Sequence, residues 1–309
     1  MTLAIVNPAA AGGRGLAKWR RLEPRLAADL GALEVRLTAA AGDERRLVAE
    51  GWAAGHRQVL AAGGDGTVNA VLGALLECVP EDGRGAVALG AAGLGSSNDF
   101  HKPYRAVIEG VPCRVDFARA FPHDVGVVSY ADETGARHAR HWIVNASIGA
   151  TAEANHFFNH PDGVLRALKR TSTDAGILYA AARTLARSRP RALALGVDDA
   201  APVELATRNL GVVKNPHFTG SLSYDSPYEP ASGDFTVHHL GAVSAARLAA
   251  TFAALARGRF AGRPGTHTWR AHRLTVRDGG PFAVEIDGEV VLAVEATFTL
   301  LPACLRVCP

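Results

Sequence analysis

The stretch RQVLAAGGDGTVN, residues 57–69, decides how the first half of this chain folds. Its apolar run at residues 59–62 is typical of a parallel strand that is buried on both faces. A glycine-rich segment at residues 63–67 ends that run. Apolar residues then recur at helical spacing, at Val68, Val71, Leu72, Leu75 and Leu76. The stretch therefore predicts a strand, a tight polar loop and a helix, in that order.

The loop has a composition that suits phosphate binding. Gly63, Gly64 and Gly66 allow the backbone to approach a ligand closely, and the helix start offers unpaired N–H groups at the positive end of the helix dipole. Asp65 would repel phosphate unless a cation stood between them, so this residue also indicates Mg²⁺. The alternative is an ordinary strand-to-helix turn in which Asp65 or Thr67 caps the helix.

Strands and helices alternate through the first part of the chain. Strands are predicted at residues 3–6, 33–37, 59–62 and 86–89, and helices at residues 18–30, 43–54 and from 68 onward. This order predicts a mostly parallel sheet wound with helices, in which ligands bind beyond the carboxyl ends of the strands. Glycine-rich polar loops follow three of the strands, at residues 7–15, 63–69 and 93–99. Neither a GxxxxGK[ST] phosphate loop nor a strand-linked GxGxxG dinucleotide motif occurs.

From about residue 120 the pattern changes to many strands with few helices. The strands are predicted at residues 124–130, 142–147, 192–197, 209–213, 233–238, 273–276, 282–286 and 290–299, and the helices at residues 176–188 and 243–257. We therefore expect an α/β domain over residues 1–120 and a mainly antiparallel domain over residues 121–300. The tail, residues 301–309, could return to the first domain.

The composition is that of a globular chain, with 48% hydrophobic and 20% charged residues. A net charge of +3 is too small to indicate a nucleic-acid partner, and no apolar run approaches the about 18 residues of a membrane span. We read no leader sequence and expect a cytoplasmic protein with reduced cysteines. Basic residues gather near the helix at 176–188, among them Lys169, Arg170, Arg183 and Arg187. This segment either lies on an anionic membrane or packs on the core with a solvated basic face.

Three segments carry a family resemblance: NP…GGRG from Asn7, GGDGTVN at residues 63–69 and LGAAGLGSSNDF at residues 89–100. In this order they resemble the catalytic domain of the diacylglycerol kinase family, which includes bacterial lipid kinases and the sphingosine and ceramide kinases. GGDGT alone is shared with NAD kinases, whereas SSNDF indicates the lipid branch. The resemblance implies ATP and Mg²⁺ as cofactors. It implies nucleotide contacts or ordering of the cleft at Asn7, Thr38, Gly63, Gly64, Asp65, Gly66, Thr67, Asn69, Ser96, Asn98 and Asp99.

A further signal is VEIDGEV, residues 284–290. On its own it predicts a β-hairpin with an Asp-Gly turn. The family has a DGE segment in which an acid acts as general base, facing the glycine-rich loop across a cleft between the nucleotide domain and a β-sandwich domain. The resemblance therefore implies Glu289 as the base. Asp287 is the alternative, because the sequence does not show which side chain of the hairpin faces inward.

Two further sites rest on the resemblance. Residues 141–159 match a family segment that turns towards the cleft, which makes Asn145, Ser147 and Gly149 candidate cleft residues. Some bacterial members hold a structural Mg²⁺ with acidic residues near residues 214–234. Asp225 and Asp234 are the nearest acids there. The predicted metal ligands are therefore Asp65 in the loop and Asp234 in the second domain.

Together these signals predict an ATP- and Mg-dependent lipid kinase that transfers the γ-phosphoryl group to a hydroxyl of a lipid such as diacylglycerol. The alternatives are an NAD kinase-like phosphotransferase and a non-catalytic nucleotide- or lipid-binding protein. The expected partner is a lipid at a membrane surface, reached by peripheral contact at the inner membrane face. A homodimer is compatible with the sequence, and no nucleic acid is expected.

Overall fold

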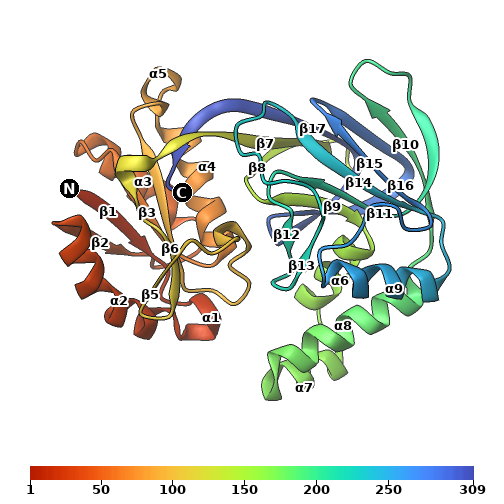
Figure 1. Cartoon of the computed structure of the whole chain (residues 1–309), viewed down its shortest axis with the longest axis horizontal. Coiled ribbons are helices and arrows are strands. Elements are labelled where there is room, and N and C mark those ends of the chain that lie inside the picture. Colours follow the sequence, from red (N-terminus) through yellow and green to blue (C-terminus); the bar gives the residue numbers. More distant parts are fainter.

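The chain forms two domains that lie side by side, with two long strands running between them (Figure 1). These strands are β7 (Phe121–Ala131) and β17 (Glu289–Val307). The structure, a computed structural model, describes the backbone of residues 1–309 and every side chain except those of Arg170, Thr173, Asp174 and Ile177. The predicted role of Arg170 in the basic segment therefore lies outside the described residues.

The first domain is built on a sheet in which β2, β1, β3 and β4 pair in parallel. Every residue of β1 and β4 is buried, as expected for strands covered by helices on both faces. Trp19, Leu22 and Leu26 of α2 recur at helical spacing and are buried. The elements are β1 (Thr2–Val6), α1 (Ala10–Gly13), α2 (Gly15–Leu30), β2 (Leu33–Leu37), α3 (Asp43–Ala53), β3 (Gln58–Gly63), α4 (Asp65–Cys78), α5 (Glu81–Arg84), β4 (Ala88–Gly93), η1 (Asp99–His101), β5 (Ala106–Ile108), β6 (Val111–Arg114) and η2 (Phe117–Arg119).

The second domain is mainly antiparallel, with β9, β10, β11, β14, β15, β16 and β17 paired in that sense. The helices α6, α7, α8 and α9 lie below its strands in the view of Figure 1. Its elements after β7 are β8 (Arg137–Trp142), β9 (Asn145–Gly149), α6 (Ala150–Asn159), α7 (Gly163–Thr171), α8 (Thr173–Arg187), β10 (Arg191–Val197), β11 (Val203–Val213), β12 (His217–Phe218), β13 (Leu222–Ser223), β14 (Phe235–Gly241), α9 (Ala245–Leu255), β15 (Thr266–Ala271), β16 (Leu274–Ile286) and β17.

Several predicted boundaries in the second domain differ from the structure. The strand predicted at residues 142–147 is two strands, β8 and β9, with a break at Ile143 and Val144. The strands predicted at 273–276 and 282–286 are one strand, β16, which carries an irregularity between Arg277 and Phe282. The sequence pattern predicted only the last residue of β8 and did not predict α6, α7 or β15.

The end of the chain lies in the first domain. Arg306 and Val307 of β17 pair in parallel with Ala88 and Leu89 of β4. Leu305 and Val307 belong to the apolar core beneath α3 and α4, whereas Phe298, earlier in the same strand, belongs to the core of the second domain. A single strand therefore contributes to both cores.

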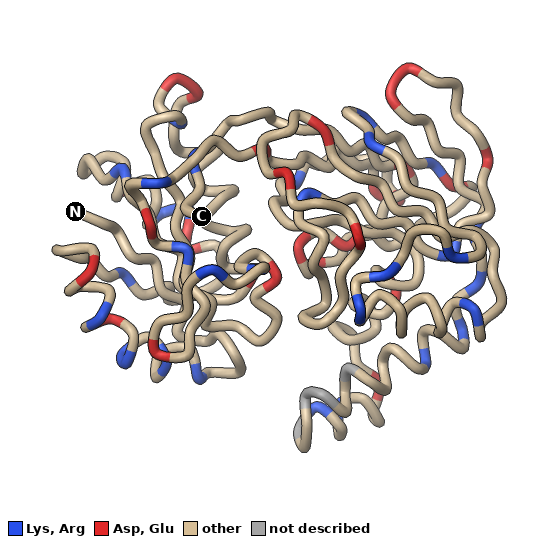
Figure 2. The backbone as a smooth tube through the Cα atoms, viewed as in Figure 1, with Lys and Arg blue, Asp and Glu red and all other residues tan. Residues whose placement is uncertain are grey.

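The surface of both domains carries charged residues of both signs. Figure 2 shows Lys and Arg along the helices at the lower edges of the two domains. Among the described residues, no helix combines the length and apolar character that crossing a bilayer requires.

Candidate active site

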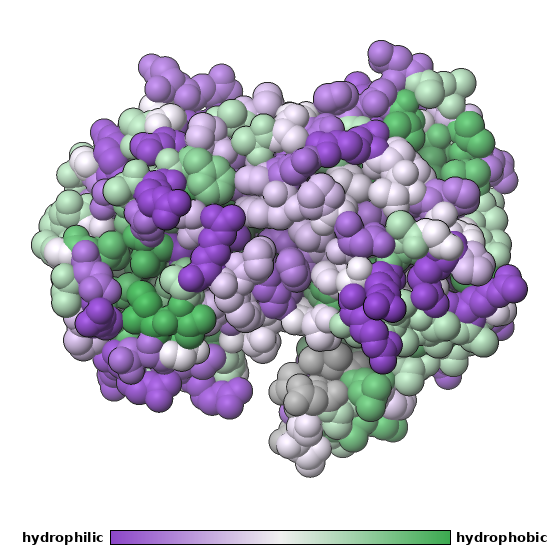
Figure 3. Space-filling view, in the orientation of Figure 1, coloured by the Kyte–Doolittle hydropathy of each residue, from purple (hydrophilic) through white to green (hydrophobic). Residues whose placement is uncertain are grey.

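A cleft of about 790 Å³ lies between the two domains. The first domain lines it with the loops that follow β1, β2, β3 and β4, and the second with α6, α8 and the hairpin between β16 and β17. Figure 3 shows the molecule hollowed between the domains. The carboxyl ends of neighbouring parallel strands meet at one edge of the sheet, which explains why loops far apart in sequence share this cleft.

The glycine-rich loops after β3 and β4 lie directly against each other. The N–H groups of Leu94 and Gly95 both donate to the carbonyl of Gly63, at 2.8 and 3.3 Å. A Cβ at Gly95 would lie 2.6 Å from the Cα of Gly64, and a Cβ at Gly63 would lie 2.2 Å from Oγ1 of Thr67. Packing alone therefore requires glycine at these positions, whatever the ligand.

The ends of β1 and β2 complete this wall of the cleft. Asn7 Nδ2 donates to Thr67 Oγ1 at 3.0 Å, so the first loop is fastened to the start of α4. Thr38 is buried, and its N–H donates to the carbonyl of Val6 at 2.9 Å. Both residues line the cleft together with Gly64, Asp65, Gly66, Thr67 and Ser96. Most residues predicted to contact nucleotide are thus brought to one place.

Two acids, Asp65 and Asp99, stand on this wall. Asp65 Oδ1 accepts from the N–H of Phe100 at 2.9 Å. Burial, together with the charge of Asp99, raises the pKa of Asp65. Asp99 accepts from Lys102 Nζ at 2.7 Å and from the N–H of Gly220 at 3.1 Å, which ties the first domain to the second. A cation bound between the two carboxylates would relieve their mutual repulsion.

Two residues predicted at the nucleotide site make other contacts. Asn98 has φ 50° and donates to the carbonyls of Gly93 and Gly95 at 3.1 and 3.3 Å, so it shapes the loop. Asn69 Nδ2 donates to the carbonyl of His141 and to Asp287 Oδ2, both at 2.8 Å. Neither residue lines the cleft. Asn69 thus links the first domain to the second.

The Asp-Gly-Glu hairpin forms as predicted, with Asp287 and Gly288 in the turn and positive φ values of 45° and 92°. Asp287 is buried and accepts four hydrogen bonds, from Asn69 and from the N–H groups of residues 143–145, at 2.8–3.0 Å. Burial raises the pKa of Asp287 to about 6, although these hydrogen bonds act to lower it. Because its oxygens already hold four donors, Asp287 anchors the hairpin to the break between β8 and β9.

Glu289 lies at the mouth of the cleft. It lines the cavity, and its side chain is 67% exposed. Arg140 NH1 lies 3.6 Å from Glu289 Oε2. Both acids that the resemblance implied as the base line the cavity, but Glu289 is exposed there whereas Asp287 is buried and already accepts four hydrogen bonds.

The sequence analysis missed a buried acid in the cleft, Glu285. Its side chain lines the cavity, accepts from Ser147 Oγ at 2.8 Å and accepts from the N–H of Gly288 at 2.6 Å. Burial raises the pKa of Glu285 to about 7. Simple strand alternation puts Glu285 on the face opposite Val284 and Ile286, which suggests solvent. Only the pairing of β16 with β9, which sets Glu285 opposite Ser147, reveals that this face is covered.

Glu285→Gln is expected to raise the thermal stability increasingly as the pH rises. The folded state holds the proton of Glu285 more tightly than the unfolded chain does. Ionisation of Glu285 therefore lowers the free energy of unfolding as the pH rises from about 4.5 to about 7. Glutamine has no such charge, and we expect its Tm to exceed that of the wild type by about 3–6 °C at pH 8 but by little at pH 4.5. Thermal melts across this range measure the difference, and a difference independent of pH would contradict the prediction.

The second predicted metal ligand, Asp234, is engaged by a positively charged side chain. Asp234 is paired with Arg270, whose Nε donates to Asp234 Oδ2 at 2.5 Å. Asp225 Oδ2 accepts from the N–H groups of Phe260 and Ala261 at 3.0 and 2.8 Å. Among the described residues, no three His, Cys, Asp or Glu side chains come together in a way that could hold a metal. Asp234 also does not line the cleft, so it is separate from Asp65.

Comparisons with known families agree with this architecture. The diacylglycerol kinase catalytic domain matches residues 1–112, and the YegS C-terminal NAD kinase beta sandwich-like domain matches residues 146–309. The chain belongs to the family in which a diacylglycerol kinase catalytic domain is followed by the YegS C-terminal domain. The two family domains meet at the cleft, because residues 1–112 supply its glycine-rich wall and residues 146–309 supply the hairpin.

Individual members of the family are similar over part of the chain. A probable lipid kinase YegS-like protein of Chromohalobacter salexigens is 43% identical over 94 residues, which are 27% of this chain and 29% of that protein. One from Cronobacter sakazakii is 36% identical over 124 residues, 38% of this chain and 36% of that protein. The alignments thus span about a third of the length of these relatives. A putative diacylglycerol kinase from Bacillus anthracis shares the fold, with a TM-score of 0.75 and 19% identity over 99% of this chain and 96% of that one.

Proposed function

We propose that this protein is an ATP- and Mg-dependent lipid kinase, which transfers the γ-phosphoryl group to a hydroxyl of a lipid such as diacylglycerol. The observation that carries the proposal is the two-sided cleft. The first domain contributes glycine-rich loops and the start of α4, and the second domain contributes apolar side chains, among them Phe158, Ala180 and Phe218. A phosphate donor suits the first wall, and the hydrocarbon part of a lipid suits the second.

Phosphoryl transfer depends on alignment and on neutralising charge at the transferred group. In the proposal, the backbone N–H groups at the start of α4 and the hydroxyls of Thr67 and Ser96 bind the phosphates. Asp65 fits a magnesium ligand, because its carboxylate lines the cleft near that of Asp99 and is destabilised there by burial. Bound Mg²⁺ would supply positive charge to the phosphates. Glu289, across the cleft, accepts the proton of the attacking lipid hydroxyl.

The helical hairpin of α7 and α8 is the proposed contact with a membrane. Val164 and Leu178 are large apolar residues there with 54% and 72% exposure, and α8 also contributes Ala180 to the cleft. Exposed apolar side chains among basic residues favour an anionic lipid surface. Membrane attachment, a location at the inner membrane face and a homodimer stay predictions.

The test is transfer of labelled γ-phosphate from ATP with Mg²⁺ to a panel of diacylglycerol, monoacylglycerol, ceramide, sphingosine and NAD. We expect label on one of the lipids and a large loss of label when the same panel is offered to an Asp65→Asn variant. Label on NAD alone would replace the proposal with an NAD kinase-like activity. Tight nucleotide binding with no labelled acceptor would favour a binding protein.

A further inference from the structure

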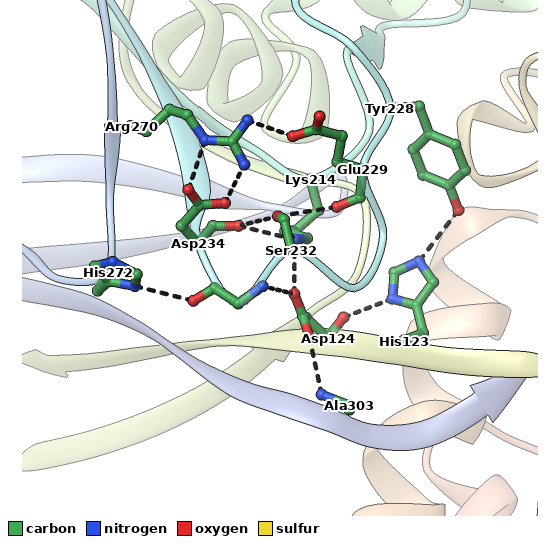
Figure 4. Close-up of polar contacts among 11 residues, drawn as sticks. His123, Asp124, Lys214, Tyr228, Glu229, Ser232, Asp234, Arg270, His272 and Ala303 are labelled. Carbon is green, nitrogen blue, oxygen red and sulfur yellow. Dashed lines mark hydrogen bonds and ion pairs between the residues drawn. The ribbon is translucent and has the colours of Figure 1, made fainter.

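Lys214 lies at the end of β11 with its ammonium group enclosed by oxygen atoms (Figure 4). Its side chain is 1% exposed. Nζ donates to Asp124 Oδ2 at 2.8 Å, to Ser232 Oγ at 3.0 Å and to the carbonyl of Asp234 at 2.8 Å. We call these three acceptors the Lys214 cage. Because a neutral amine has only two hydrogens to donate, three acceptors at hydrogen-bond distance indicate the charged form.

The cage lies where the paired strands β7 and β17 pass from one domain into the other. Asp124 belongs to β7 and faces an irregularity in β17 between Leu301 and Leu305. In this bulge Ala303 has φ 46°, and its N–H donates to Asp124 Oδ1 at 2.8 Å. On either side of the crossing the strands enter different cores: Leu305 packs in the first domain and Phe298 in the second. The Asp124 carboxylate therefore fixes both strands at the boundary between the domains.

The Asp124 carboxylate depends on Lys214 for charge compensation. It is 1% exposed, and it also accepts from the N–H of Gly233 at 2.8 Å. Burial disfavours its charge, but hydrogen bonds from Lys214 and from two backbone N–H groups outweigh this and lower the pKa of Asp124. The nearby acids Glu229 and Asp234 both pair with Arg270, so they are not available to a second cation.

The Lys214 cage has the donor chemistry of a hard metal site, since carboxylate, hydroxyl and carbonyl oxygens are the ligands of Mg²⁺ and Ca²⁺. In this chain an ammonium group stands at the centre of these oxygens. It leaves no room for a divalent ion, which would also repel the fixed positive charge. The structural metal that the family resemblance implied for this region therefore does not fit the residues present.

We propose that Lys214 serves as a built-in cation at the domain crossing, occupying with its ammonium group the position that a divalent metal would take, so that this junction is stable without metal. The proposal concerns the fold and does not depend on the proposed kinase activity. The three acceptors of the cage then form a cation site, which a metal ion can enter only when the Lys214 side chain has been shortened.

The first experiment measures the metal dependence of the wild-type protein without nucleotide. We expect no stoichiometric metal by elemental analysis after dialysis. We also expect Tm values in EDTA and in millimolar Mg²⁺ or Ca²⁺ to agree within about 1–2 °C. A stoichiometric metal in the wild type that is lost in an Asp124→Asn variant would overturn the proposal.

The second experiment opens the cage with Lys214→Ala. Removing one partner of a buried ion pair leaves an uncompensated carboxylate, and we expect Tm to fall by about 5–10 °C in EDTA. Ca²⁺ or Mg²⁺ should then restore at least half of the loss. Lys169→Ala on α7 is the matched control, because Lys169 contacts Phe158 outside the cage, and its Tm should not respond to metal.

The two experiments together decide the proposal. A folded Lys214→Ala protein whose Tm ignores divalent ions would show that the cage is not a cation site. If Lys214→Ala is insoluble with and without metal, the wild-type protein and its Asp124→Asn variant decide alone. Wild-type protein that is metal-free and has the same Tm in EDTA supports the built-in cation, and stoichiometric metal that is lost in Asp124→Asn refutes it.

Discussion

Asp65→Asn is expected to lower kcat for lipid phosphorylation by about 10²- to 10³-fold without lowering the Tm. Asp65 lines the cleft at the first position of α4, and in the proposed mechanism its charge holds Mg²⁺ against the phosphates. Losing one preorganised electrostatic group typically costs a factor of this size. The stability should not fall, because burial and the neighbouring Asp99 raise the pKa of Asp65 and disfavour its carboxylate.

The matched control is Asp29→Asn in the same domain. Asp29 lies on α2, its side chain is 41% exposed, and it pairs with Arg25 at 3.3 Å. We expect wild-type kcat and Tm from this variant, since surface ion pairs contribute little. Wild-type turnover from Asp65→Asn would remove this residue from the mechanism. A turnover loss accompanied by a lower Tm would assign the effect to the fold.

The features that the sequence predicted well are local ones. The strand, loop and helix at residues 58–78 depend on apolar runs and glycines that are adjacent in the chain. The family resemblance implied that Asn7, Thr38 and Ser96 lie near this loop, and all three line the same cleft, as expected where the ends of parallel strands meet at one edge of a sheet. Local pattern, sheet topology and the family resemblance together were enough to predict which loops form the glycine-rich wall of the cleft.

The features that the sequence did not reveal depend on distant partners. At the break between β8 and β9, the carboxylate of Asp287 accepts hydrogen bonds from the N–H groups of residues 143–145. These residues lie more than 140 positions earlier in the chain. Glu285 and Lys214 read as ordinary charged residues until β9 and β7 are placed beside them. No periodicity within either segment carries this information.

Glu289→Gln is expected to lower kcat by about 10²- to 10⁴-fold with little change in KM or in Tm. In the proposed mechanism Glu289 removes the proton of the lipid hydroxyl, and glutamine keeps the shape of the side chain but cannot accept that proton. The exposed position of Glu289 at the mouth of the cleft means that the fold should not depend on its charge. Steady-state kinetics with the lipid identified by the acceptor panel measure the effect, and melting curves check the fold.

Two matched variants separate proton transfer from other roles of the hairpin. Glu295→Gln changes the same residue type on the same strand, where Glu295 pairs with exposed Arg277, and should keep wild-type turnover. Asp287→Asn should instead lower the Tm, because an amide nitrogen cannot accept from the buried N–H groups that Asp287 now holds. Full activity in Glu289→Gln would assign the proton acceptor elsewhere. Asp287, the alternative base, and Glu285 would then be the residues to test, because both carboxyls also line the cleft.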